Sequence, residues 1–152
     1  MPRPVTQLSA LTEAANYALD RRDWAALRFN ASLMTKEDPT SPVALSYLGV
    51  AFLQLGLEKQ QPVYVEKGLE YHREAVRLGP DHAVALGNLG VALLKLGQAS
   101  QSLEILATAT KLHPQDRDLL GYRAQAELDV GQLGGADRSV RRLLPLLGGR
   151  LA

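Results

Sequence analysis

Two stretches of the chain, SYLGVAFLQLG (46–56) and GNLGVALLKLG (87–97), decide the fold. Both contain Leu-Gly-Val-Ala and both end in Leu-Gly. In the second stretch and the residue before it, leucines recur at helical spacing and form one apolar stripe, at Leu86, Leu89, Leu93 and Leu96. Glycine adopts the left-handed cap conformation without penalty, so Gly97 is expected to end this helix.

A second apolar stripe follows, made of Leu103, Leu106, Ala109 and Leu112. Pro114 is expected to end it, because proline lacks an amide hydrogen and excludes the α conformation at the residue before it. Asp116 then suits the N-cap of the next helix. The pattern predicts a pair of antiparallel helices.

The pair is repeated along the chain. Ala75 and Pro80 have the same spacing as Ala109 and Pro114, and the same ruler gives units 8–41, 42–82, 83–116 and 117–150. Stacked helical pairs bury a common core. We therefore expect an all-α solenoid with a concave groove, forming a single domain over 1–152, with the last unit as a cap. The expected helices are 6–20, 24–37, 42–55, 62–78, 82–96, 98–112, 117–130 and 133–147.

The second unit is seven residues longer than the others, and the extra residues lie between Gly56 and Gly68. Leu57–Gln60 are good helix formers, and Pro62 suits a first helical turn. We expect the extra residues to lengthen both helices into a projecting hairpin that carries Tyr64 outward.

The spacing Leu-x2-Leu-Gly-x2-aromatic/Leu-x3-Gly, followed by Ala-x4-Pro at a period of 34, resembles the tetratricopeptide repeat. Small residues match at Gly49, Gly90, Ala75 and Ala109, and the terminal proline matches at Pro39, Pro80 and Pro114. The fourth unit departs from the pattern, with Arg123 and Glu127 at apolar positions. We interpret these two residues as the outer face of a capping unit; the alternative is a different register in this unit.

The resemblance implies a protein-interaction module whose groove is lined by the first helix of each repeat. It places these candidate partner-binding residues in the groove: Asn16, Tyr47, Val50, Gln54, Gly87, Asn88, Val91, Lys95, Tyr122 and Gln125. Amide side chains can donate and accept hydrogen bonds, as a peptide backbone requires. Gly87 would allow a ligand to approach closely. The alternative for Tyr47 and Tyr122 is simple packing against their neighbours.

Composition argues against most other functions. The net charge is +1 and there is no cysteine, so neither nucleic acid nor a thiol-based metal site or nucleophile is expected. His72, His82 and His113 lack a metal-binding spacing, and His72 is expected to pack as a buried ring. We expect no membrane insertion, no cofactor, no catalysis and a cytoplasmic location. Two functions remain: an adaptor that binds a partner protein or peptide, or a structural subunit of an assembly or homo-oligomer.

Overall fold

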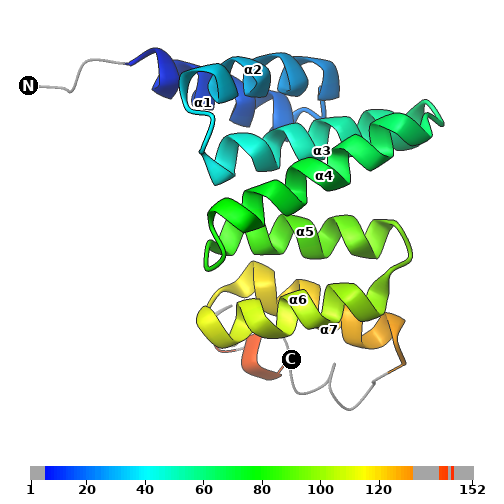
Figure 1. Ribbon diagram of the computed structural model, residues 1–152. Helices are drawn as coiled ribbons and strands as arrows, with labels where there is room; N and C mark the ends of the chain where they lie inside the picture. The colour runs from blue at the N-terminus through cyan, green and yellow to red at the C-terminus, as the bar shows by residue number, and fades with distance from the viewer. Residues whose placement is uncertain (1–5, 132–140, 144, 146–152) are drawn as a thin grey trace, which may run out of the picture. The chain divides into compact units, whose positions relative to one another are not determined.

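The computed structural model describes residues 6–131, 141–143 and 145, and these contain helices and no strand. The described residues include the following helices, which are labelled in Figure 1: α1 (Gln7–Asp20), α2 (Trp24–Glu37), α3 (Pro42–Glu58), α4 (Pro62–Leu78), α5 (Ala83–Lys95), α6 (Ala99–Leu112) and α7 (Arg117–Asp129). The all-α prediction is confirmed. Most of the expected helix 133–147 lies outside the described residues. The chain divides into two compact units, Met1–Gly79 and Pro80–Ala152.

Helix starts follow from short polar side chains that accept the free amide hydrogens of a first turn. Thr6, Asp23 and Ser41 cap α1, α2 and α3 in this way. The predicted cap at Asp116 is confirmed, since its carboxylate accepts a hydrogen bond of 3.1 Å from the amide of Leu119.

Gly56 and Gly97 occupy the same place in the repeat, but only one of them ends a helix. Gly97 has a φ of 73° just after α5, so its predicted role as a helix stop is confirmed. Gly56, by contrast, is buried inside α3, which continues to Glu58 rather than ending at residue 55 as expected. A Cβ on Gly56 would lie 2.7 Å from the backbone nitrogen of Val65. This glycine therefore allows α4 to approach α3, and the turn falls at Gln60, with a φ of 52°.

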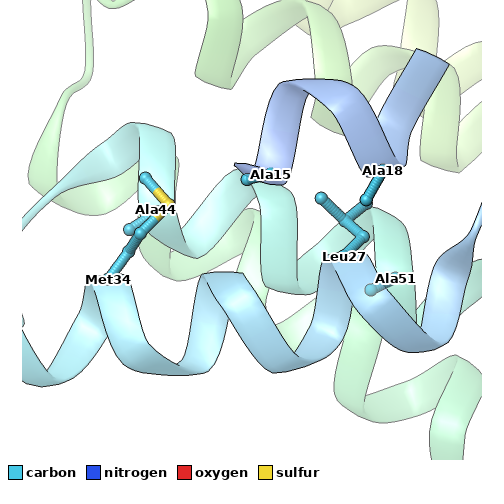
Figure 2. Close-up of a cluster of buried hydrophobic side chains, with 6 residues drawn as sticks. All are labelled: Ala15, Ala18, Leu27, Met34, Ala44 and Ala51. Atoms are coloured by element: carbon cyan, nitrogen blue, oxygen red, sulfur yellow. The ribbon is translucent and has the colours of Figure 1, made fainter. Parts of the chain in front are cut away.

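One core cluster of the first unit combines two large side chains, Leu27 and Met34, with alanines of the neighbouring helices. Figure 2 shows Leu27 of α2 reaching toward Ala18 of α1, and Met34 lying beside Ala44 of α3. Leu27 and Ala44 have no exposed surface. Alanines on the neighbouring helices leave room for the leucine and methionine side chains.

The contact between α3 and α4 depends on two glycines and a histidine. A Cβ on Gly68 would lie 2.7 Å from the backbone nitrogen of Leu53 and 2.9 Å from the carbonyl oxygen of Gly49. A Cβ on Gly49 would lie 2.7 Å from the His72 ring. His72 is 1% exposed, which confirms the prediction that it packs as a buried ring. The expected role of Gly49 in helix approach is confirmed as well.

An aromatic and cationic cluster joins α2, α3 and α4. The ring of Phe52 packs edge-on against Tyr64, with centroids 5.4 Å apart, and a second ring, Tyr71, lies at 5.4 Å. The Arg28 guanidinium and the Lys67 ammonium each lie 5.0 Å from the Phe52 centroid. The expectation that Tyr64 points outward is therefore wrong, because its ring packs against Phe52.

In the second unit, α5 and α6 meet at Gly90. A Cβ there would lie 2.6 Å from Leu106, and the Ser102 hydroxyl donates a hydrogen bond of 2.7 Å to the Gly90 carbonyl oxygen. Ser102 is fully buried, and this bond satisfies its hydroxyl inside the core. Gly90 thus serves the close approach of paired helices that the sequence predicted.

The polar residues of α7 correct one prediction. Glu127 is 3% exposed, so it does not form an outer face. Arg123 donates to the Glu127 carboxylate at 2.9 Å and to the Thr110 hydroxyl of α6 at 2.8 Å. The pair replaces two apolar residues of the repeat with an ion pair one helical turn apart, which is tolerated because each charge has a partner.

Candidate functional site

In the first unit, two predicted site residues contact each other. The Tyr47 hydroxyl of α3 donates a hydrogen bond to the Asn16 side-chain oxygen of α1. Tyr47 is half-buried and packs against both core clusters of this unit. Burial raises the pKa of Tyr47 above its ordinary value, and the negative charge of Asp20 raises it further. The packing interpretation of Tyr47 is thus supported, and Asn16 already has a partner.

The other two predicted residues of this unit lie on α3. Val50 is half-buried and packs against the core cluster that contains Leu27 and Ala44. Gln54 is half-buried, and its side chain has no hydrogen bond to any described residue. These observations place neither Val50 nor Gln54 in a pocket with the Asn16–Tyr47 pair.

In the second unit, a hollow of about 110 Å³ lies between α5 and α7. It is lined by Ala83, Val84, Gly87, Asn88, Asp116, Asp118, Leu119 and Tyr122. Three predicted site residues therefore share one hollow: Gly87, Asn88 and Tyr122. The sequence singled out Asp116 only as a helix cap. The structure also places Asp116 beside this hollow, because α7 packs on α5.

Gly87 lines the hollow, and the space of its missing side chain faces α7. It is buried, and a Cβ on it would lie 3.0 Å from Leu119 and 3.6 Å from the Tyr122 ring. Its missing side chain makes room for α7, and close approach by a ligand stays a prediction. Gly121, at the same repeat position on α7, has no atom of another described part of the chain within 4 Å of its would-be Cβ.

Asn88 and Tyr122 offer polar atoms to the hollow. Asn88 is half-buried and Tyr122 is 36% exposed. No described residue forms a hydrogen bond with either side chain. Burial raises the pKa of Tyr122, and the carboxylates of Asp118 and Asp116 raise it further, so the hydroxyl stays protonated at neutral pH.

The remaining predicted residues lie outside this hollow. Val91 is half-buried on α5, and Lys95 is exposed in the last turn of that helix. Gln125 donates its amide to Asp129 at 2.8 Å along the same helix. The described contacts therefore bring together Asn16 and Tyr47 in the first unit. In the second unit they bring together Gly87, Asn88 and Tyr122.

Two histidines at turns have structural contacts. The His82 ring accepts from the Ala85 amide at 3.4 Å and caps α5. The His113 ring lies 2.5 Å from the carbonyl oxygen of Asp81. The described part of the chain contains no group of three or more metal-ligating side chains and no helix long and apolar enough to span a membrane.

Comparison with known proteins accounts for this arrangement. Residues 65–136 match the family described as tetratricopeptide repeat. A thermophilic tetratricopeptide-repeat protein of Thermus thermophilus superimposes with a TM-score of 0.85 at 19% identity, covering 97% of this chain and 78% of that one. The chain has a tetratricopeptide-repeat fold. The helices α5 and α7, which border the hollow, begin the third and fourth units that the sequence predicted.

Two further tetratricopeptide-repeat structures are similar. YrrB, a protein with an unusual peptide-binding site, has a TM-score of 0.68 at 14% identity and covers 95% of this chain and 71% of its own. The first tetratricopeptide-repeat domain of Spaghetti (RPAP3), bound to the HSP90 peptide SRMEEVD, also has a TM-score of 0.68 at 14% identity, covering 82% and 96%. No curated protein sequence matches this chain.

Proposed function

We propose that this tetratricopeptide-repeat chain is a non-catalytic scaffold that binds a segment of a partner protein on the first helices of its repeats. Tetratricopeptide-repeat domains typically act in protein–protein interaction, and two similar structures are of peptide-binding proteins. The observation that carries the proposal is the hollow between α5 and α7, where Asn88 and Tyr122 present polar atoms without hydrogen-bond partners among the described residues.

These two side chains suit an extended peptide. The Asn88 amide can donate to a backbone carbonyl and accept from a backbone amide at the same time. Tyr122 adds a rigid ring with a polar tip, a residue type that often dominates binding energy at protein interfaces. A hydrogen bond of this kind contributes about 0.5–1.5 kcal/mol, and truncation of an aromatic anchor costs about 2 kcal/mol or more.

The test is a pull-down with identification of partners by mass spectrometry, followed by calorimetric titration of a confirmed partner. Asn88→Ala should weaken binding several-fold and Tyr122→Ala by more. Tyr17→Ala is the matched control, because Tyr17 is 64% exposed on α1, outside the hollow. Tyr47→Ala is a poor probe, since Tyr47 also packs against the core. If both hollow variants bind like the parent protein, the proposal fails.

The alternative of a structural subunit or homo-oligomer is favoured by one feature, the tip of the α3–α4 hairpin. Val63 is 70% exposed and Leu57 40% exposed there, beside an apolar depression that also includes Pro62 and Val65. Light scattering coupled to size-exclusion chromatography distinguishes the two. A mass that rises with protein concentration would favour assembly, and a constant monomer mass would favour the scaffold.

A further inference from the structure

We infer that the hollow between α5 and α7 holds a cationic side chain, lysine or arginine, of the partner segment. This inference rests on the proposed function and specifies the chemistry of the ligand at the same surface. Its volume of about 110 Å³ suits one side chain rather than a folded element.

The walls of the hollow match the two parts of such a side chain. Val84, Ala83 and Leu119 supply apolar surface, against which the methylene stem of lysine or arginine can lie. Asn88, Asp118 and Tyr122 supply oxygen atoms that accept hydrogen bonds. A lysine ammonium has three donors, and it can also be attracted to the face of the Tyr122 ring.

Charge gives the hollow its selectivity. Two of its lining residues, Asp116 and Asp118, carry carboxylates, and none of the described residues that line it is lysine or arginine. Asp116 uses one oxygen to cap α7, whereas no described residue forms a hydrogen bond with the side chain of the exposed Asp118. The chain as a whole has a net charge of +1, so this negative patch is a local property. Hydrogen bonds between ionised partners are stronger than neutral ones.

The contrast with the first unit supports an external partner for Tyr122. Tyr47 and Tyr122 are both the sixth residue of their units, 42–82 and 117–150. Tyr47 donates its hydroxyl to Asn16, the ninth residue of the preceding unit, whereas the ninth residue of the unit before Tyr122 is Val91. A valine side chain cannot accept a hydrogen bond. The Tyr47 hydroxyl therefore has a partner within the chain, whereas the Tyr122 hydroxyl is open to a ligand.

A random-peptide library displayed to the immobilised full chain tests the inference. We expect the enriched peptides to contain a shared lysine or arginine. The strongest is then synthesised with an acetylated N-terminus, which removes a terminal ammonium as an alternative occupant. Replacing its lysine by norleucine, or its arginine by glutamine, should weaken binding roughly tenfold, which corresponds to about 1.4 kcal/mol, because the neutral side chain loses the hydrogen bonds that a cation donates to a carboxylate. Titrations with the lysine and arginine forms of the peptide identify the preferred cation.

Two variants of the protein locate the effect. In Asp118→Asn, the charged and neutral peptides should bind within about threefold of each other, because the only carboxylate left among the described residues that line the hollow is that of Asp116, which already caps α7. In Glu104→Gln, the matched control with an exposed carboxylate on α6, the tenfold preference should remain. If no peptide is enriched over a blank surface, both the proposed function and the inference fail. If peptides are enriched but the neutral replacement binds equally well, or Asp118→Asn keeps the preference, the inference alone is overturned.

Discussion

Replacing Gly68 with alanine is expected to destabilise the chain, although alanine is the better helix former. Gly68 lies within α4, where the change in helix propensity alone would stabilise by about 1 kcal/mol. The new Cβ would lie 2.7 Å from the nitrogen of Leu53 and 2.9 Å from the oxygen of Gly49. Both are backbone atoms of α3, so no side-chain rotation relieves the overlap and the two helices must separate.

Overpacking of this kind costs about 1–3 kcal/mol, and a clash with backbone belongs at the upper end. Subtracting the gain in propensity leaves a net loss of about 2 kcal/mol in the free energy of unfolding. Urea unfolding followed by far-ultraviolet circular dichroism measures it.

Gly121→Ala is the matched control for this substitution. Gly121 lies within α7, and outside its own helix no atom of the described residues stands within 4 Å of its would-be Cβ. The same added methyl group should therefore stabilise the chain by about 1 kcal/mol and raise its melting temperature by about 2–4 °C. If Gly68→Ala is as stable as the parent, or if the two variants shift in the same direction, the argument from helix approach is refuted.

Three further predictions concern the second unit. Glu127→Ala should lower the free energy of unfolding by about 3 kcal/mol, because it leaves the partly buried Arg123 without its carboxylate; urea unfolding measures the loss. Asp116→Ala should lower it by about 1 kcal/mol, since the amide of the first turn loses its acceptor; the same assay applies. Tyr122 should ionise above its ordinary pKa of 10.0, and the stability that it contributes below pH 10 should be lost as the pH rises through the raised pKa. Ultraviolet titration should show this pKa lowered in Asp118→Asn, with burial keeping it above the ordinary value.

The helices could be predicted closely because their ends depend on local chemistry. A glycine at φ 73°, a proline that excludes the α conformation and a carboxylate cap are written at single positions, Gly97, Pro114 and Asp116. Gly56 shows where this reasoning stops. It ends the same Leu-Gly pattern as Gly97, yet it lies inside α3, because Val65 of α4 needs the space. That requirement is set by a residue of the next helix, which local pattern does not reveal.

The outline of the candidate site could be predicted from repeat register, but the packing of individual side chains within it could not. Repeat register placed Asn88 and Tyr122 on one surface, and the structure brings them to one hollow. Register could not show that the space of the missing Gly87 side chain is filled by Leu119 of α7. It also could not show that Glu127 turns inward, although its spacing from an arginine four residues earlier, typical of a helical ion pair, was a usable signal.

Packing positions and binding positions in this chain obey different constraints. Where helices cross, the side chain is fixed by the space that the partner helix leaves, as at Gly49, Gly68 and Gly90. On the first-helix faces, one repeat position can hold a different residue in each unit, provided that its polar atoms find a partner somewhere. Tyr47 finds one in Asn16 of the preceding repeat and is thereby held in place. Tyr122 occupies the same repeat position and has no such partner among the described residues. Its hydroxyl is therefore the group that this comparison singles out as best suited to bind a ligand.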